Sequence, residues 1–353
     1  MITVDKSLKA RWDELKTQEP NLRIRAAATK LGVSEAQLLA TQLGEGVTRL
    51  AGDWEALLKR VPELGKAMAL TRNEAVVIEK TGPYNKPEFF SHGGPSIGQV
   101  VGPEIDLRLF MHAWHHGFAV QKAVRNTTMY SLQFFDAAGD AVHKIYLRDK
   151  DKLPVYESIV EEFRAGEQAA PALEPRKTNT SDANDTAVDA EAFLEGWANM
   201  TNTHDFFHLL RKHKVSRTHA LELAKGRFAW PLSGTPWREA LTKAAETELP
   251  IMVFAGNPGC LEIHTGPVKK LLPMEDWFNV MDPGFNLHIN EPQLQQCWIT
   301  EKPTDDGIVS ALECFDAHGN MAVQFFGERK PGRKELEGWR EIVAGLKAQS
   351  AEQ

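Results

Sequence analysis

The sequence predicts an α+β protein that arose by tandem duplication, with two homologous halves that each fold as an antiparallel sheet with flanking helices. Three observations support this prediction. Short motifs recur in the same order about 180 residues apart. In each half, helical patterns come before short β-rich runs, and a polar segment without periodicity separates the two halves.

The duplication is visible in three pairs of matching motifs. These pairs are FDAAGD at 135–140 with FDAHGN at 315–320, TGP at 81–83 with TGP at 265–267, and KLGVS at 30–34 with KHKVS at 212–216. A unit of about 150 residues is a normal domain size. We therefore expect an N-terminal repeat over 1–165, a linker over 166–189 and a C-terminal repeat over 190–353. Two such copies commonly enclose a ligand site, so we expect a ligand in the cleft between them.

The first half opens with helical spacing and closes with β-rich runs. Ser34 and Gln37 form a capping-box pattern that starts one of the expected helices. Gly and Pro separate runs rich in β-branched and aromatic residues, which is typical of short strands. We expect helices over 8–15, 24–31, 34–43 and 154–163, and strands over 75–80, 107–114, 129–136 and 142–147.

The second half repeats this order. We expect helices over 192–199, 206–213, 216–223 and 335–346, and strands over 260–265, 285–290, 296–300, 309–316 and 322–328. The segment 166–189 contains Pro and Thr and lacks a hydrophobic period, which is typical of a linker.

Composition places the chain among soluble globular proteins of the cytoplasm. With 42% hydrophobic and 25% charged residues, it can bury a normal core, and no apolar run is long enough to span a bilayer. The charged N-terminus predicts no signal peptide, and the net charge of −7 argues against nucleic acid or an anionic membrane as partner. Cys260, Cys297 and Cys314 are expected to be reduced core thiols. A monomer and a homodimer both remain open.

The two copies differ at positions where the second has gained imidazole or guanidinium groups. His204 precedes the helix expected at 206–213, where the first copy has Leu22, and Arg217 stands opposite Glu35. Further differing pairs are Arg108 with His288, Lys144 with Gln324, and Tyr146 with Phe326, and Arg329 follows the last strand. An imidazole is a versatile metal ligand, while Arg and Lys suit carboxylates. Together with many aromatics, this set suits an iron porphyrin, which combines a metal, two propionates and a flat apolar body.

Six long motifs stand in order along the chain. They are LTRNEAVVIEKTGPY and IDLRLFMHAWHHGFAV in the first half, and THDFFHLLRKHKVSRTHAL, IMVFAGNPGCLEIHTGPV, WITEKPTDDGIVSALECFDAHGN and VQFFGERKPG in the second. With these motifs the chain resembles the cytoplasmic haem-binding proteins of Gram-negative haem-uptake systems, the HemS/ChuS/PhuS group of hemin transport and hemin-degrading factors. The resemblance covers nearly the whole chain, apart from the linker and the extreme ends.

The resemblance implies a bound haem b in which His204 is the proximal iron ligand. Arg108, in the DLRLF strand, corresponds to the distal residue that ligates iron or orders a water on it. Three further matching positions are expected to contact the haem propionates: Arg217, Lys302 and Arg329. Three others are expected to line the haem pocket: Phe254, Gln324 and Phe326. Phe326 departs from some relatives that carry a tyrosine there, which removes the hydrogen bond of one hydroxyl.

The same resemblance implies a role in haem uptake but leaves two function classes open. One is a carrier that receives imported haem and passes it on for degradation, with a haem oxygenase and the inner-membrane haem importer as partners. The other is an enzyme that opens the macrocycle itself, using a reductant with oxygen or peroxide. Residue types do not separate the two, because oxygen activation on haem depends on distal polarity, access and an electron source. The chain carries no Rossmann glycine fingerprint for a nicotinamide.

Ordinary structural roles compete for several of these residues. His204 could cap a helix or lie on the surface, and Arg108 could be a solvated strand residue. His112, His115 and His116 have spacings that could hold zinc on a helix. They lie in a strand-like run without a thiol or a close carboxylate, so a structural role or a transient haem contact is the favoured interpretation.

A DNA-binding protein is the alternative from another class. Residues 24–40, IRAAATKLGVSEAQLLA, resemble a helix-turn-helix with Gly32 at the turn. The second helix offers one acid, one amide and no base, whereas DNA recognition needs basic or amide side chains. Composition therefore disfavours this alternative.

Overall fold

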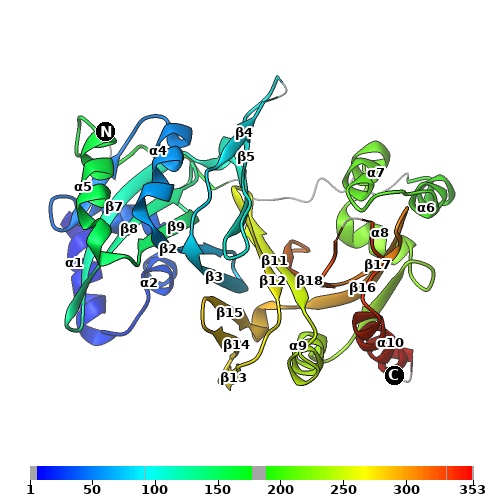
Figure 1. Cartoon of the computed structure of the whole chain (residues 1–353). Helices are drawn as coiled ribbons and strands as arrows, with labels where there is room; N and C mark the ends of the chain where they lie inside the picture. The colour runs from blue at the N-terminus through cyan, green and yellow to red at the C-terminus, as the bar shows by residue number, and fades with distance from the viewer. Residues whose placement is uncertain (1–5, 92, 177–187, 331, 352–353) are drawn as a thin grey trace. The chain divides into compact units, whose positions relative to one another are not determined.

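The computed structural model describes residues 6–91, 93–176, 188–330 and 332–351, and the chain divides into two compact units (Figure 1). The first unit comprises Met1–Arg72, Glu79–Lys177 and Gly256–Glu262, and the second comprises Asn73–Ile78, Thr178–Ala255 and Ile263–Gln353. Residues 177–187 of the expected linker lie outside the described residues. The repeat boundaries expected at 165 and 190 stay a prediction.

The first repeat has helices at its start and end and strands between them. Its helices are α1 (Lys6–Gln18), α2 (Ile24–Leu31), α3 (Glu35–Ala40), α4 (Trp54–Arg60) and α5 (Leu153–Glu162). Its strands are β1 (Val47–Leu50), β2 (Lys66–Arg72), β3 (Val76–Pro83), β4 (Glu88–Phe90), β5 (Ile97–Val100), β6 (Asp106–Phe110), β7 (His116–Val124), β8 (Thr127–Phe135) and β9 (Ala141–Leu147).

The second repeat follows the same order. Its helices are α6 (Ala190–Ala198), α7 (Asp205–His213), α8 (Arg217–Leu223), α9 (Pro236–Glu246) and α10 (Glu337–Ala351). Its strands are β10 (Ala229–Leu232), β11 (Ile251–Asn257), β12 (Cys260–Gly266), β13 (Leu271–Met274), β14 (Trp277–Asp282), β15 (Phe285–Asn290), β16 (Gln296–Thr304), β17 (Gly307–Phe315) and β18 (Met321–Gly327).

Each unit contains two sheet layers and borrows a strand segment from the other repeat. In the first unit the strand orders are β1-β7-β8-β9-β2-β3 and β12-β6-β5-β4, and in the second they are β10-β16-β17-β18-β11-β12 and β3-β15-β14-β13. The exchange occurs within single strands, because β3 passes from the second unit to the first after Ile78 and β12 passes from the first to the second after Glu262. The predicted class, antiparallel sheets with flanking helices in two homologous halves, is confirmed.

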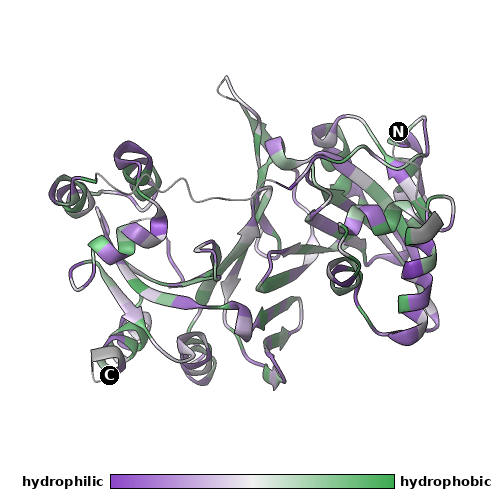
Figure 2. Cartoon of the chain, turned by 180° about the vertical axis from the view of Figure 1, so that it is seen from behind, coloured by the Kyte–Doolittle hydropathy of each residue, from purple (hydrophilic) through white to green (hydrophobic). Residues whose placement is uncertain are grey.

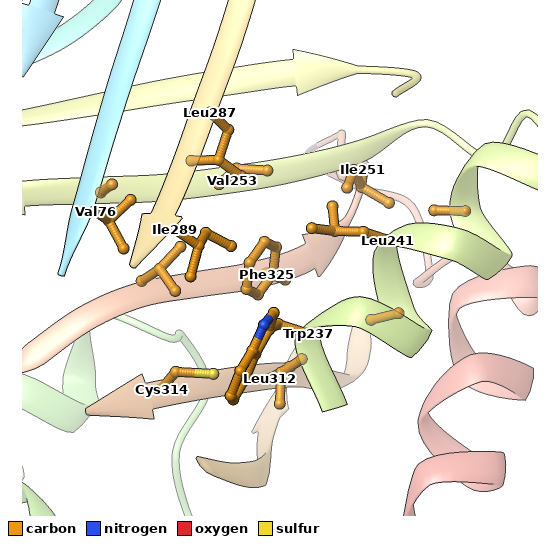
Figure 3. Close-up of a cluster of buried hydrophobic side chains, with 14 of the residues drawn as sticks. Val76, Trp237, Leu241, Ile251, Val253, Leu287, Ile289, Leu312, Cys314 and Phe325 are labelled. Carbon is orange, nitrogen blue, oxygen red and sulfur yellow. The ribbon is translucent and has the colours of Figure 1, made fainter. Parts of the chain in front are cut away.

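The core of the second unit forms between its two sheet layers and two helices (Figure 3). Val253, Leu312 and Phe325 come from neighbouring strands and point to one side, as the two-residue period of a strand requires. Trp237 of α9 covers them, and Val76 reaches this core through the exchanged segment of β3. The opposite side of β16, β17, β18 and β11 therefore remains available for other side chains.

The local predictions are largely confirmed. Ser34 and Gln37 form the capping box, with Ser34 Oγ accepting from Gln37 N at 3.3 Å and Ser34 N donating to Gln37 Oε1 at 2.8 Å. Figure 2 shows hydrophilic and hydrophobic residues interleaved along the helices, as amphipathic packing requires.

Two elements are shorter than predicted. The helix expected to reach residue 43 ends at Ala40, and the strand expected to reach residue 114 ends at Phe110. A short 3-10 turn, Met111–Ala113, replaces the end of that strand.

Several elements were not predicted, including α4, α9 and the short strands β4, β5, β13 and β14. β4 and β13 have exposed side chains at more than one position, so their sequences lack the clear alternation of half-buried strands. Within the described ranges, no helix combines the length and apolar character that a membrane crossing requires.

Candidate functional site

One sheet face of the second unit collects most of the side chains that the sequence singled out. On β17, Leu312 points into the core, so Glu313 next to it points to the opposite face. The strand register sets Gln324 of β18 opposite Glu313 and also opposite Phe254 of β11. Lys302 of β16 joins the same face, because its ammonium group bonds to Glu313. We refer to this surface, formed by Phe254, Lys302, Glu313, Gln324 and Phe326, as the ligand face.

An aromatic pair forms the apolar part of the ligand face. The rings of Phe254 and Phe326 meet edge to face, with centroids 5.2 Å apart and planes at 71°. Both side chains are half-buried. Gln324, which lies on β18 opposite Phe254, is also half-buried. Half-buried aromatics on a sheet face can take up a flat apolar ligand, and the amide of Gln324 adds a donor and an acceptor.

An ion-pair triad forms the charged part of the ligand face. Arg217, the first residue of α8, binds the Glu313 carboxylate through two hydrogen bonds, from Nη2 to Oε1 at 2.6 Å and from Nε to Oε2 at 2.8 Å. Lys302 Nζ donates to Glu313 Oε1 at 2.7 Å and to Thr300 Oγ1 at 3.2 Å. The ring of Phe206 on α7 lies near both cations, 5.1 Å from the Arg217 guanidinium and 4.8 Å from Lys302 Nζ.

The triad carries a net positive charge next to a buried carboxylate. Burial by itself would raise the pKa of Glu313, but the attraction of Arg217 and Lys302 outweighs it and holds that pKa below its usual range. Burial lowers the pKa of Lys302, against the opposing attraction of Glu313. Lys302 is only 5% exposed, whereas the Arg217 side chain is 28% exposed. Arg217 is therefore the triad cation that an incoming carboxylate can reach first.

His204 lies at the entrance of α7 in the same unit. It occupies the N-cap position, and its side chain makes no capping hydrogen bond. Its loop is held from both sides, because Asp205 Oδ2 accepts from Asn202 N at 2.9 Å and Thr201 O accepts from Asp305 N at 2.9 Å. The imidazole is exposed and has no hydrogen-bond or ion-pair partner in the part of the chain that the structure describes. A fixed loop thus presents a free imidazole to solvent.

Arg329 and Arg108 lie apart from the triad. Arg329 follows β18 and is half-buried, and its Nε has no hydrogen-bond partner among the described residues. Arg108 belongs to the first unit, in the middle of β6, where it pairs with Asp106 and donates to Leu107 O at 3.1 Å. The structure therefore gathers Arg217, Lys302, Phe254, Gln324 and Phe326 on one face, places His204 and Arg329 in the same unit, and places Arg108 in the other.

The other candidates of the sequence take ordinary places. His112 and His115 are exposed, with His115 Nε2 3.0 Å from His112 O, and burial lowers the pKa of half-buried His116. Within residues 6–91, 93–176, 188–330 and 332–351, no group of three or more His, Cys, Asp or Glu side chains could hold a metal ion. The second helix of the helix-turn-helix pattern, α3, is buried along most of its length, so it cannot enter a DNA groove.

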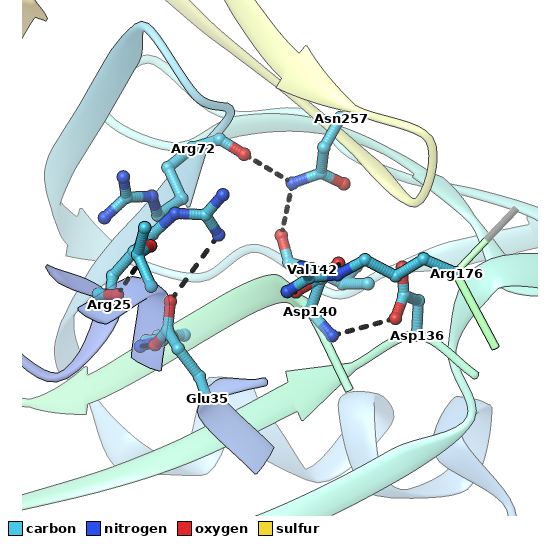
Figure 4. Close-up of polar contacts among 10 residues, drawn as sticks. Arg25, Glu35, Arg72, Asp136, Asp140, Val142, Arg176 and Asn257 are labelled. Atoms are coloured by element: carbon cyan, nitrogen blue, oxygen red, sulfur yellow. Dashed lines mark hydrogen bonds and ion pairs between the residues drawn. The ribbon is translucent and has the colours of Figure 1, made fainter. Parts of the chain in front are cut away.

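The corresponding face of the first unit has the opposite charge arrangement (Figure 4). There the helix carries the acid, and Glu35 of α3 accepts from Lys144 Nζ of β9 at 2.5 Å. Arg25 approaches Glu35 at 3.7 Å. Burial by itself would raise the pKa of Glu35, but the combined attraction of Lys144, Arg72 and Arg25 lowers it. In the second unit the helix carries the base, Arg217, and the strand carries the acid. The two faces are therefore homologous in position but not in chemistry.

Sequence reasoning missed two members of this site, Glu313 and Phe206. Phe206 is buried, and its ring also covers the two cations. An acid inside the apolar run VSALECF was the available indication of a buried ion pair. Its partners could not be assigned, because they come from a different strand and a different helix.

Comparison with known proteins agrees with this architecture. A family model described as the haemin-degrading HemS.ChuX domain matches the chain twice, over residues 32–163 and 214–346. The hemin transport protein HemS of Yersinia enterocolitica is 35% identical over 348 residues, which cover 97% of this chain and 98% of that protein. The hemin transport protein HmuS of Yersinia pestis is also 35% identical, over 344 residues.

Two solved structures match over almost the full chain. Holo-PhuS, a heme-binding protein from Pseudomonas aeruginosa, has a TM-score of 0.91 and 44% identity, covering 97% of this chain and 98% of that one. ChuS, a heme degrading enzyme of Escherichia coli O157:H7, has a TM-score of 0.89 and 32% identity, covering 96% and 98%. Two matches to the family model and full-length relatives of this similarity show that the chain belongs to the HemS/ChuX family.

Proposed function

We propose that this protein binds haem in the cytoplasm as part of a haem-uptake system, receiving imported haem and passing it on for degradation. The proposal is supported by relatives that are named hemin transport or heme-binding proteins and by a ligand face of matching chemistry. Its partners would be the inner-membrane haem importer and a haem oxygenase. The position of haem in the cleft between the two halves, and the choice between monomer and homodimer, stay predictions.

The free imidazole of His204 is the observation that carries the proposal. A neutral imidazole is a common axial ligand of haem iron, and an exposed ring without a protein partner can take that role without first losing a hydrogen bond. The aromatic pair Phe254–Phe326 suits the macrocycle, and Arg217 suits a propionate. The residues present therefore fit haem b.

The remaining assigned roles follow from the contacts of each residue. Arg329 has a buried Nε without a hydrogen-bond partner among the described residues, and its guanidinium, which also attracts the Glu335 carboxylate, would hold a second propionate. Lys302 is covered by Glu313 and Phe206, so a propionate cannot contact its ammonium group while the triad is intact. We therefore assign to Lys302 an electrostatic attraction of the propionate at a distance. Arg108 would be the residue opposite His204, and its guanidinium would donate hydrogen bonds to a water near the iron.

Replacing His204 tests the iron ligand. His204→Ala is expected to lose the wild-type Soret position of the haem complex and to bind haem more weakly, both measured by titration with absorbance detection. His208→Ala is the matched control, because His208 is another exposed histidine on α7 and should keep the wild-type spectrum. A His204→Ala protein with wild-type spectrum and affinity would show that the ligand lies elsewhere.

Degradation of haem is the second candidate function. It is favoured by the likeness to ChuS, which is called a heme degrading enzyme and a heme oxygenase. The deciding experiment gives the haem-loaded protein an electron donor, oxygen and catalase, and follows the tetrapyrrole by chromatography. Repeated formation of an open tetrapyrrole would exclude a pure carrier, whereas intact haem that transfers to an added haem oxygenase would support one.

A further inference from the structure

Two of the three cysteines face each other inside the second unit. Cys297 of β16 and Cys314 of β17 are direct partners in the antiparallel register. Their side chains meet, and the Cys297 thiol donates to Cys314 Sγ at 2.7 Å. Cys260 is different, since it belongs to the first unit and its sulfur lies 3.4 Å from Thr71 Oγ1.

The backbone at this pair suits a covalent link. Directly opposed residues of an antiparallel pair have Cα atoms about 4.5 or 5.5 Å apart, depending on their hydrogen bonding. Disulfides span Cα distances of about 4.4–6.8 Å. Both cysteines point into the core that Figure 3 shows around Cys314, so neither side chain has to turn across the sheet to meet the other.

We propose that Cys297 and Cys314 form a redox-active pair that a peroxide converts into a cross-strand disulfide. In the first step hydrogen peroxide oxidises the Cys297 thiol to a sulfenic acid and is itself reduced to water. In the second step Cys314 sulfur attacks the sulfenic sulfur, the S–O bond breaks, and a second water leaves with the Cys314 proton. The pair thus loses two electrons and two protons, and a dithiol reductant can restore it.

The order of the two steps follows from exposure. Cys297 is 5% exposed near the start of β16, whereas Cys314 is fully buried. Burial raises the pKa of Cys314 well above its ordinary value, so Cys314 suits the second, intramolecular step better than the first encounter with the oxidant. Both groups are poorly accessible, so the oxidation is expected to be slow compared with that of an exposed thiol.

The link would join the two strands that carry the charged part of the ligand face. Cys314 directly follows Glu313, and β16 carries Thr300 and Lys302 beyond Cys297. A disulfide here would restrict the sliding of β16 against β17 and so hold the triad in one register. The proposal does not depend on haem binding, because it rests on the register and the sulfur contact alone.

The test treats the full-length native protein with hydrogen peroxide, removes the excess with catalase, and unfolds the protein in an alkylating reagent. Intact mass and peptide mapping are expected to show two of the three thiols protected, a Cys297–Cys314 cross-linked peptide, and Cys260 alkylated. Dithiothreitol should restore all three thiols. The oxidised protein should also unfold at a higher temperature than the reduced one.

Cys314→Ser and Cys297→Ser are the matched controls, and neither should gain thermal stability on oxidation. In Cys314→Ser, dimedone should trap the sulfenic acid on Cys297. The same peroxide treatment of the urea-unfolded protein is the positive control for oxidation. If that control is oxidised while the native protein keeps three free thiols, the proposal is overturned. A cross-link that includes Cys260, or oxidation of Cys297 without a bond to Cys314 in the wild-type protein, would also overturn it.

Discussion

At the residue scale, Glu313 holds the two cations of the ligand face in place through hydrogen bonds to both. Its carboxylate uses both oxygens on Arg217 and shares one of them with Lys302. Without this anion, two like charges would lie close together in a poorly hydrated place. Because Glu313 cancels one of the two charges, the triad can attract one ligand carboxylate without a large excess of positive charge.

The reachable cation of the triad gives the first prediction. Arg217→Ala should weaken binding of haem by about one to two orders of magnitude, since a charge-assisted hydrogen bond contributes roughly 1.5–3 kcal/mol. Haem dimethyl ester, which has no free carboxylates, should show little of this loss. Arg211→Ala is the control, because Arg211 is exposed on α7 outside the triad. Equal losses for haem and its ester would assign Arg217 a purely structural role.

A buried network in the first unit predicts a pH dependence of stability. Burial raises the pKa of Glu262 from 4.5 to about 8 and lowers that of His143 from 6.5 to about 3. Between about 4.5 and 8 the unfolded chain has lost the Glu262 proton while the folded protein retains it. The stability that Glu262 contributes below this range is therefore lost as pH rises, by at most about 1.4 kcal/mol per pH unit.

Glu262→Gln should remove this decline and stabilise the protein most on the alkaline side of the range. Its free energy of unfolding is measured by urea denaturation at several pH values. The acid-side loss of stability should remain, because buried His143 must gain a proton as pH falls through its unfolded value. Glu157→Gln, an exposed acid of α5, is the control. Parallel pH curves for Glu262→Gln and wild type would contradict the prediction.

At the element scale, the turn between β8 and β9 packs against the start of α3. Gly139 has φ +85°, and its carbonyl accepts from Ala36 N at 3.1 Å. An added Cβ would overlap Ser34 Oγ and lie 3.0 Å from Ala36 Cβ. The corresponding turn of the second repeat has Gly319 at φ +75°, but the nearest atoms, on Thr218, lie 3.4 Å from an added Cβ.

This asymmetry between repeats gives a matched pair of variants. Gly319→Ala should cost about 1–2 kcal/mol for the left-handed backbone alone. Gly139→Ala should cost more, because the overlap with Ser34 also disturbs the capping box of α3. Denaturant midpoints of the two variants would test the order, and a Gly319→Ala loss equal to or larger than the Gly139→Ala loss would refute it.

At the scale of the whole molecule, the exchanged strand segments make each unit depend on both repeats. Val76 and Ile78 are fully buried in the core of the second unit, although they belong to the first repeat in sequence. In return, Cys260 is buried in the core of the first unit. Cleavage of the chain between the repeats therefore leaves each core complete, whereas removal of one repeat takes buried residues out of the core of the remaining unit.

The isolated fragment 190–353 should be less stable than the same unit in the intact chain. It lacks Val76 and Ile78, whose burial contributes roughly 1.5–3 kcal/mol each. A chain cleaved between the repeats keeps both segments, so it should retain the wild-type circular dichroism, and its unfolding midpoint should lie above that of the isolated fragment. The comparison uses urea denaturation of the fragment, the cleaved chain and the intact chain. A fragment as stable as the intact chain would show that the exchanged segment contributes little.

The sequence by itself determined the duplication, the helix-before-strand order of each repeat, the capping box at Ser34 and the position of His204 at a helix entrance. These features depend on interactions within a few residues, or on the comparison of one repeat with the other, and both are visible along the chain. Even so, the extents of α3 and β6 were wrong by a few residues, because tertiary packing decides where an element ends.

Only the tertiary structure decided which side chains meet. The triad of Arg217, Lys302 and Glu313, the opposed thiols of Cys297 and Cys314, and the exchange of strand segments all depend on strand register and long-range pairing. A shift of one residue in register would move every side chain of a strand to the other face. Register is selected by the packing of the whole core, and for this reason these contacts could not be derived from sequence patterns alone.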